Sequence, residues 1–218
     1  MTIESSIPIG HGYGSSTADV IASIRAVAAS ARVTLRQSTV ARLAVAAESA
    51  SDAIAYCDQA LLFAQREGRT IEHFGGEFPP FLVVGFRDGS ARPIDTLGMR
   101  RARYDSEEIG VFRVLRGLAC RSIRQQDPRL LGRVATISAR ISQRYLPKAA
   151  FNTVLDIARG HDACGVQVAH SGTLIGILLD AAAPRPAMRA VELARQLRGA
   201  GFTDVHTFGL NAETRVIQ

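Results

Sequence analysis

The segment PIGHGYGSSTA, residues 8–18, places three glycines, two serines and a threonine directly before an apolar helical pattern. Gly10, Gly12 and Gly14 can adopt positive φ angles and allow a ligand to approach the backbone closely. The first N–H groups of a helix have no partners inside the helix and lie at the positive end of its dipole. These residue types at this spacing therefore favour the binding of an anion such as a phosphate group.

The hydroxyl groups that follow the glycines leave two interpretations open. Ser15, Ser16 and Thr17 could contact phosphate oxygens or a cation. Alternatively, Ser15 or Ser16 could simply cap the helix after an ordinary glycine turn. The segment is not a Walker loop, because no lysine follows the last glycine, and its glycine spacing differs from that of a dinucleotide fingerprint. It also lacks the glycine two positions after the serine that a nucleophile elbow needs.

Two helices are predicted to position these groups. The first begins near Ser16, with apolar residues at three- and four-residue spacing that predict one buried face: Val20, Ile21, Ile24, Val27 and Ala28. The second runs from about Ser38 to Glu48 and is followed by a polar turn and another apolar segment. Glu48 and Asp52 lie at its end and offer the hard oxygen ligands that Mg²⁺ prefers.

Residues 8–18 resemble the phosphate-binding loop of the GHMP small-molecule kinases, whose pattern is approximately P-x-G-x-G-L-G-S-S-x-A. Tyr13 stands where the family usually has leucine and keeps a large side chain. The resemblance implies ATP as the cofactor, bound by the residues of this loop: Pro8, Gly10, Gly12, Tyr13, Gly14, Ser15, Ser16 and Thr17. It also implies that Glu48 binds Mg²⁺ together with the loop serine, here Ser16, which is among the expected catalytic residues.

Asp52 is similar to the acid in the E-P-[ST]-D stretch of the L-threonine kinases, a branch of this superfamily, but one extra residue separates it from Glu48. Three roles stay open for Asp52: a catalytic base for a substrate hydroxyl, a ligand for the substrate ammonium, or a helix cap. Asp95, in the segment PIDT, matches a V-D-T segment of the same relatives or is a turn residue.

Lys148 is the only lysine among 26 basic residues, and in an arginine-rich chain this indicates a position where a compact ammonium is needed. The surrounding segment RYLPKAAF is similar to the L-P-K-P stretch of the L-threonine kinases, with Ala149 in place of the second proline. The preceding segment, from LLGRVATIS onward, also looks like their helix with the pattern Gly-x-x-Ala-Thr-x-Ser. The resemblance places Lys148 among the catalytic residues.

Residues 165–180, GVQVAHSGTLIGILLD, predict a β-hairpin, because Val166 and Val168 alternate as in a strand and an apolar run follows the glycine turn. The segment VAHSGTLIG resembles the third GHMP motif, A-H-S-G-[ST]-x-x-G. In the family this turn lies beside the phosphates and the acceptor. The resemblance therefore assigns Ser171, Gly172 and Thr173 to the ATP site, facing the first glycine motif.

The order of the remaining predicted elements favours an α+β domain of ferredoxin-like type with helical insertions. These elements are a strand at residues 81–87, helices at 105–125, 127–144 and 150–163, the hairpin, a helix at 187–198 and a strand at 205–208. The resemblance implies the two-domain GHMP fold, with residues 1–76 as the remainder of the ATP-binding N-terminal domain and residues 77–218 as the ferredoxin-like C-terminal domain. The predicted boundary lies at residues 72–80, where glycine and proline interrupt the periodicity.

The start of the chain departs from the family pattern. In the family a block of strands precedes the first glycine motif, whereas here the motif begins at Pro8. We therefore expect a truncated N-terminal domain, arising from a fragment, a start codon placed too late or a truncated gene product.

The composition excludes several classes of protein. With 218 residues, 47% of them hydrophobic and 21% charged, the chain can bury a substantial core. No apolar run approaches the length of a membrane span, and no secretory signal is visible, so a cytoplasmic protein without membrane contact is expected. Cys57, Cys120 and Cys164 are far apart and are expected to be reduced thiols. The net charge of +6 is spread along the chain, which argues against a nucleic-acid partner.

The resemblance as a whole implies a kinase that transfers the γ-phosphoryl group of ATP, with Mg²⁺, to the hydroxyl of L-threonine. The product, L-threonine O-3-phosphate, would feed the aminopropanol linker of cobalamin. Two alternatives stay open: another GHMP enzyme such as a homoserine kinase, and an inactive nucleotide-binding or regulatory fragment. A homodimer is also left open.

Overall fold

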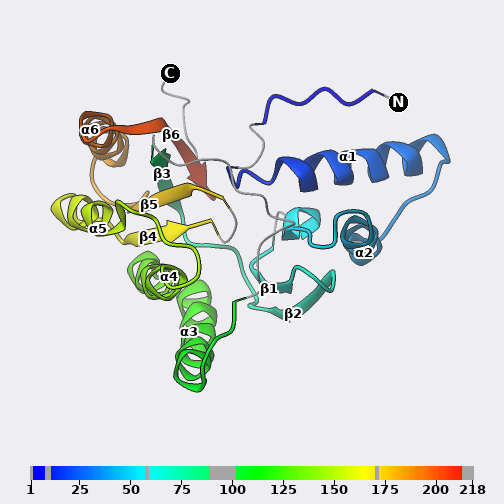
Figure 1. Ribbon diagram of the computed structural model, residues 1–218, viewed down its shortest axis with the longest axis horizontal. Helices are drawn as coiled ribbons and strands as arrows, with labels where there is room; N and C mark the ends of the chain where they lie inside the picture. The colour runs from blue at the N-terminus through cyan, green and yellow to red at the C-terminus, as the bar shows by residue number, and fades with distance from the viewer. Residues whose placement is uncertain (1, 8–10, 57–58, 89–101, 170–171, 213–218) are drawn as a thin grey trace. The chain divides into compact units, whose positions relative to one another are not determined.

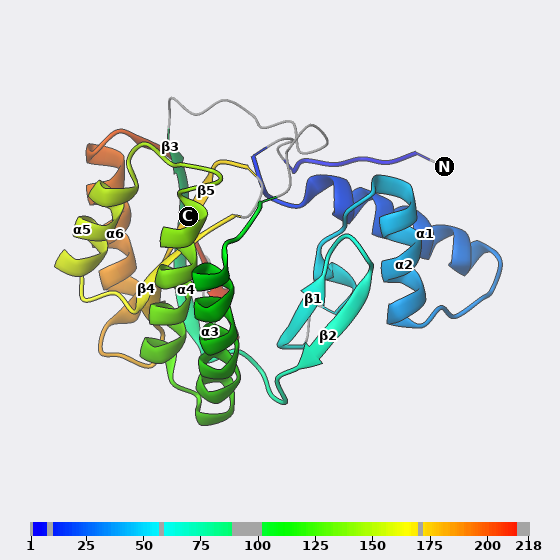
Figure 2. The same cartoon turned by 60° about the horizontal axis from the view of Figure 1, so that its bottom comes forward.

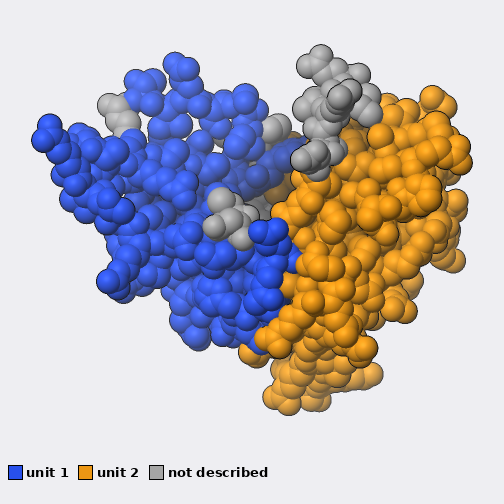
Figure 3. Space-filling model, turned by 180° about the vertical axis from the view of Figure 1, so that it is seen from behind, with its two compact units in different colours: residues 1–9, 13–77 blue, residues 10–12, 78–218 orange. Residues whose placement is uncertain are grey.

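The computed structural model describes residues 2–7, 11–56, 59–88, 102–169 and 172–212, and Figures 1 and 2 show its helices and strands. By its internal contacts the chain divides into two compact units, coloured separately in Figure 3. Unit 1 comprises residues 1–9 and 13–77, and unit 2 comprises residues 10–12 and 78–218. Among the described residues, none of the helices has both the length and the apolar composition that a membrane span requires.

The described residues of unit 1 form two helices, a short 3₁₀ helix and a two-stranded antiparallel sheet. Its elements are α1 (Ser15–Ser30), α2 (Gln37–Glu48), η1 (Ala53–Tyr56), β1 (Leu61–Ala64) and β2 (Arg69–His73). The core packs Ile21 of α1 against one face of α2 and against Ala55 and Tyr56 of η1. Val20 and Ile24 also contact this core, but Val27 is 60% exposed, so the buried face of α1 is shorter than predicted.

The β1–β2 hairpin of unit 1 is a feature that the sequence analysis did not predict. Strand β2 has the sequence RTIEH, in which exposed residues alternate with half-buried ones. Its single apolar residue, Ile71, is exposed, and no apolar run marks a strand. The two strands pair antiparallel, and the turn between them contains Gly68 at φ 64°. A side chain at position 68 would meet the backbone of α2 at 3.1 Å, so this glycine allows the hairpin turn to lie against α2.

Unit 2 contains a four-stranded antiparallel sheet with the strand order β4-β5-β3-β6. The strands are β3 (Phe81–Asp88), β4 (Gly165–Val168), β5 (Leu174–Asp180) and β6 (Phe202–Leu210). Numbered along the unit, the order is 2-3-1-4, which is the ferredoxin-like arrangement of two interleaved β-α-β units. The predicted α+β class is therefore confirmed, and so is the predicted order of elements.

Four helices accompany this sheet: α3 (Ser106–Gln125), α4 (Pro128–Ser142), α5 (Phe151–Gly160) and α6 (Pro186–Gly199). Helices α5 and α6 lie side by side and share the larger core with one face of the sheet (Figure 2). On the other face, Phe81 and Val83 of β3 contact Leu131 and Ala135 of α4. Burial on both faces explains why β3 has a continuous apolar run and not an alternating one.

Helix α4 and strand β4 approach each other at backbone distance through two glycines. A Cβ atom on Gly132 would lie 2.3 Å from the carbonyl carbon of Cys164, and one on Gly165 would lie 2.0 Å from the carbonyl oxygen of Gly132. Thr136 secures the contact, because its Oγ1 donates to the Gly132 carbonyl at 2.8 Å and accepts from the Val166 N–H at 2.9 Å. The Gly-x-x-Ala-Thr pattern of this helix therefore has a structural role in unit 2.

We predict that Gly132→Ala destabilises unit 2 by about 1–3 kcal/mol, because the methyl group has no space between two backbones. Gly117→Ala on α3 is the matched control, since nothing lies within 4 Å of its Cβ position. Alanine has the higher helix propensity, so the control should gain about 0.5–1 kcal/mol. Urea unfolding followed by circular dichroism measures both values, and equal effects of the two substitutions would contradict the close α4–β4 contact.

Candidate functional site

The N-terminus of α1 is formed by the glycine motif. Gly14 is the N-cap residue in a left-handed conformation, φ 73° and ψ 23°, and no side chain caps the helix. The alternative in which Ser15 or Ser16 caps α1 is therefore not what the structure contains. Ser15 is 7% exposed and Ser16 is exposed, so the first turn offers both backbone N–H groups and an accessible hydroxyl.

Two hydroxyl groups of this first turn converge on Glu48, the last residue of α2. Ser16 Oγ donates to Glu48 Oε2 at 2.5 Å, and Thr17 Oγ1 donates to Glu48 Oε1 at 2.8 Å. Ser49, in a left-handed conformation with φ 63°, ends α2 directly after this carboxylate. The structure thus joins residues 16 and 48, which the sequence analysis paired through the family resemblance alone.

The chemistry of these donors fits Mg²⁺, which takes hard oxygen ligands and usually retains waters and substrate phosphate oxygens. Ser16 Oγ and the Glu48 carboxylate would supply the protein ligands. Among the described residues, no group of three or more histidine, cysteine, aspartate or glutamate side chains is placed to hold a metal ion alone. A cation here would therefore need oxygens from a bound phosphate and from water to complete its coordination.

Asp52 belongs to the same part of unit 1, despite the extra residue that separates it from Glu48. Its backbone N–H donates to Thr17 Oγ1 at 3.3 Å. Its Oδ2 lies 3.3 Å from the position that a Cβ of Gly14 would take, so the carboxylate borders the start of α1. Asp52 precedes η1 in sequence.

In unit 2 the described part of the first glycine motif contacts the third motif directly. The carbonyl oxygen of His11 accepts from the Thr173 N–H at 2.9 Å and from the Leu174 N–H at 3.2 Å. His11 Nδ1 and Thr173 Oγ1 are 3.2 Å apart. Gly172 has φ 100°, and a Cβ there would lie 2.3 Å from the His11 carbonyl carbon and 2.4 Å from the Gly12 nitrogen, so position 172 requires glycine.

Lys148 contacts the same turn from its other side. Its Nζ donates to the Gly172 carbonyl oxygen at 2.6 Å, and its backbone N–H donates to Gln143 Oε1 at 2.7 Å. Burial lowers the pKa of the Lys148 ammonium from 10.5 to about 8. The side chain that the composition singled out therefore holds a backbone carbonyl of the third motif.

Sequence reasoning missed two residues of this arrangement, His11 and Gln143. His11 occupies a variable position of the glycine motif, and it acts through its backbone carbonyl, which residue type does not reveal. Gln143 directly follows α4 and lies five positions before Lys148, a spacing without a recognisable signature. Tyr13 is partly buried, and Pro8, Gly10, Asp95 and Ser171 lie outside the described residues.

Two of the three cysteines lie among the described residues. No disulfide joins Cys120 and Cys164. Burial raises the pKa of the Cys164 thiol to about 11, which keeps it protonated and unreactive at neutral pH. Cys57 lies outside the described residues.

Comparisons with known proteins identify relatives of both units. Residues 1–63 match the family model described as the GHMP kinases N terminal domain. The chain is 32% identical over 180 residues to an L-threonine kinase of Salmonella typhimurium, a match that covers 82% of this chain and 59% of the relative. It is 33% identical over 184 residues to an L-threonine kinase of Citrobacter freundii, covering 82% of this chain and 61% of that relative. The chain therefore spans about three fifths of the length of these curated relatives.

Solved structures share the fold at low sequence identity. A protein from Listeria monocytogenes assigned as a homoserine kinase aligns with a TM-score of 0.67 and 19% identity, over 96% of this chain and 70% of that chain. Homoserine kinase from Cytophaga hutchinsonii aligns with a TM-score of 0.65 and 13% identity, over 95% and 68% of the two chains. With the family match at residues 1–63 and the relatives above 30% identity, these findings show that the chain belongs to the GHMP kinase family.

Proposed function

We propose that this chain is an ATP-dependent kinase that phosphorylates the hydroxyl of L-threonine. The observation that carries the proposal is the contact of Ser16 and Thr17 with Glu48 at an N-terminus of α1 that no side chain caps. This arrangement combines N–H donors for phosphate oxygens with hard oxygen ligands for Mg²⁺. Residues 1–76 would form the ATP-binding domain and residues 77–218 the ferredoxin-like domain.

In the proposed reaction the protein positions the reactants and compensates their charge. The N–H groups after Gly14 would bind phosphate oxygens. Ser16 and Glu48 would hold Mg²⁺, which would neutralise phosphate charge when bound. The substrate hydroxyl oxygen forms a bond to the γ-phosphorus, and the bond to the bridging oxygen of ADP breaks. We assign Asp52 as the base that accepts the hydroxyl proton, because its carboxylate borders Gly14. Lys148 and Gly172 shape the third motif.

The acceptor is proposed from the relatives, since both curated matches above 30% identity are named L-threonine kinases. The homoserine and mevalonate kinases share the fold at 12–19% identity, which carries no information on the acceptor. The proposed product, L-threonine O-3-phosphate, would serve the aminopropanol linker of cobalamin, and we place the reaction in the cytoplasm.

Glu48→Gln should lower Mg²⁺-dependent phosphorylation of L-threonine at least about a hundredfold, because an amide cannot supply the charge that balances the cation. One hydroxyl can still donate to the amide oxygen and the other can accept from the amide NH₂ group, so the fold should remain. Glu67→Gln is the control: Glu67 is an exposed acid of the same unit that pairs with Arg69. A coupled assay for ADP measures turnover, and wild-type turnover of Glu48→Gln would reject the metal assignment.

The acceptor is tested with L-threonine, L-homoserine, L-serine and mevalonate, using ³¹P NMR to detect each phosphorylated product. We expect kcat/KM to be highest for L-threonine. Calorimetry with MgATP, run in parallel, separates this proposal from the second candidate, a nucleotide-binding protein without kinase activity. That candidate predicts ATP binding with no phosphorylated product.

Lys148 should impose an alkaline limit on activity. Its pKa of about 8 means that the ammonium is about ten times less populated at pH 9 than at pH 7. If the charge is required, kcat/KM of the wild-type chain should fall about tenfold between pH 7 and pH 9. Lys148→Arg stays charged, so its kcat/KM should not fall over this interval. Lys148→Met should be impaired at both pH values. An unchanged profile in Lys148→Arg would contradict the assignment.

The titration of Lys148 can also be observed without any activity. Because Lys148 is the only lysine, ¹³C-lysine labelling gives a single ε-carbon signal in an NMR spectrum. Its chemical shift should titrate with a midpoint near pH 8 in the folded protein and near pH 10.4 in urea. A folded midpoint near 10 would show that the ammonium is not buried.

A further inference from the structure

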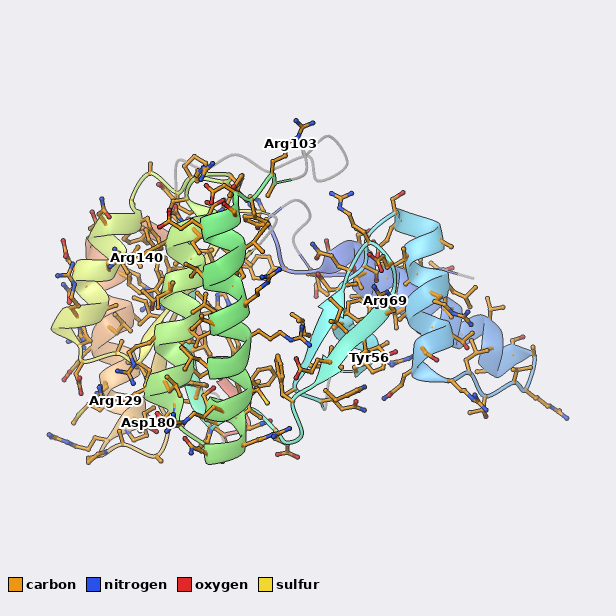
Figure 4. All side chains as sticks on the ribbon, turned by 90° about the horizontal axis from the view of Figure 1, so that it is seen from below. Tyr56, Arg69, Arg103, Arg129, Arg140 and Asp180 are labelled. Atoms are coloured by element: carbon orange, nitrogen blue, oxygen red, sulfur yellow. The ribbon has the colours of Figure 1, made fainter. Side chains whose placement is uncertain are left out.

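A cavity of about 690 Å³ lies in unit 1, at the end of α2 that is opposite to Glu48. The cavity is lined by the first residues of α2, by Tyr56 of η1 and by Arg69, Thr70 and His73 of β2. Figure 4 labels Tyr56 and Arg69, which both lie in the region of α2 and the β1–β2 hairpin. The volume of the cavity is in the range of small-molecule binding sites. Helix α2 has 12 residues, so a rise of about 1.5 Å per residue separates its two ends by roughly 16 Å. This cavity is therefore distinct from the proposed metal site.

The charged residues that line the cavity are all basic. They include Arg36, Arg42 and Arg69, together with His73, and the described lining contains no aspartate or glutamate. Arg36 and Arg42 make no ion pair or hydrogen bond with the described residues, and both are exposed to solvent. Arg69 uses its Nε to pair with Glu67 at 2.5 Å, outside the lining. Two guanidinium groups are therefore available to an anion.

The first turn of α2 adds backbone donors to these arginines. Arg36 is the N-cap residue of α2, and no side chain accepts a hydrogen bond from the N–H groups that follow it. Gln37 and Ser38, the first two helical residues, line the cavity. The positive end of the helix dipole thus coincides with the two unpaired arginines.

One hydroxyl group in the cavity lining indicates a missing partner. Thr70 Oγ1 is buried without a hydrogen-bond partner. Tyr56 also lines the cavity; it is only 7% exposed, and its ring packs against Phe63. An unsatisfied buried hydroxyl costs free energy, and an oxygen-rich ligand in the cavity would provide the acceptor that Thr70 lacks.

We propose that this cavity binds a small phosphorylated metabolite through its phosphate group. Guanidinium groups, helix N–H groups and hydroxyls are all donors, and a phosphomonoester dianion presents three acceptor oxygens to them. The remaining volume accommodates the organic part of the ligand. The site is additional to the proposed kinase reaction, because it lies at the other end of α2 from Ser16 and Glu48.

Calorimetric titration of the full chain with inorganic phosphate, in the absence of ATP and Mg²⁺, tests the site without any turnover. We expect saturable binding that Arg42→Ala weakens at least tenfold and that Tyr56→Phe weakens several-fold. Tyr56→Phe removes one hydroxyl for which the described part of the chain shows no hydrogen-bond partner, so we expect the fold to be retained. Circular dichroism and thermal unfolding without phosphate verify this for each variant.

A control variant separates the site from general charge effects. Arg66→Ala removes an exposed arginine in the β1–β2 turn that does not line the cavity. This variant should retain the phosphate affinity of the native chain. No saturable binding, an affinity that Arg42→Ala and Tyr56→Phe leave unchanged, or an equal loss in Arg66→Ala would overturn the proposal.

A second titration with glycerol 3-phosphate distinguishes a phosphate ester from free phosphate. An affinity equal to or tighter than that for inorganic phosphate, with the same dependence on Arg42 and Tyr56, supports an organic phosphate as the occupant. Exclusion of the ester while inorganic phosphate still binds would overturn the assignment to a metabolite. Neither titration depends on phosphoryl transfer, so a failure of the kinase proposal does not affect this result.

Discussion

The backbone contact between His11 and the turn at Gly172–Leu174 is the constraint on which the arrangement in unit 2 depends. One carbonyl oxygen accepts two N–H groups, and the approach is so close that a Cβ at position 172 would overlap the His11 carbonyl. Lys148 holds the opposite side of the same peptide through the Gly172 oxygen. The start of the glycine motif is thereby fixed to the third motif. In sequence, Tyr13 alone separates Gly12 from the left-handed Gly14, the N-cap residue of α1.

The elements that could be predicted are those whose burial leaves a clear periodic pattern. The continuous apolar run of β3 and the amphipathic faces of α4 and α5 correspond closely to their cores. Strand β2 could not be predicted, because it is half-exposed and its side chains are mostly polar. Val27 follows the helical spacing but is exposed. The spacing predicts which face of α1 is apolar, but it does not predict how far along the helix the packing against α2 and η1 extends.

The candidate site was accessible from the sequence only where family motifs mark it. Nothing in residue type or spacing joins Ser16 to Glu48 across 32 positions, and the contact exists because α1 and α2 pack together in one core. Ser49 turns left-handed directly after α2, and with the extra residue before it the Asp52 carboxylate borders Gly14. His11 and Gln143 were not found, because one acts through its backbone and the other through a single contact with the backbone of Lys148.

Helix α2 orders the charges of unit 1 along its own dipole. Glu48 lies at its C-terminal end, where the unpaired carbonyls already carry negative partial charge and a carboxylate is unfavourable by itself. The Ser16 and Thr17 hydroxyls compensate part of this charge, and a bound cation would compensate the remainder. At the other end, Arg36 and Arg42 add positive charge to the positive pole of the dipole, which an anion would balance. The same polarity therefore favours a cation at one end of α2 and an anion at the other, so each ligand would relieve an electrostatic cost that the fold itself creates.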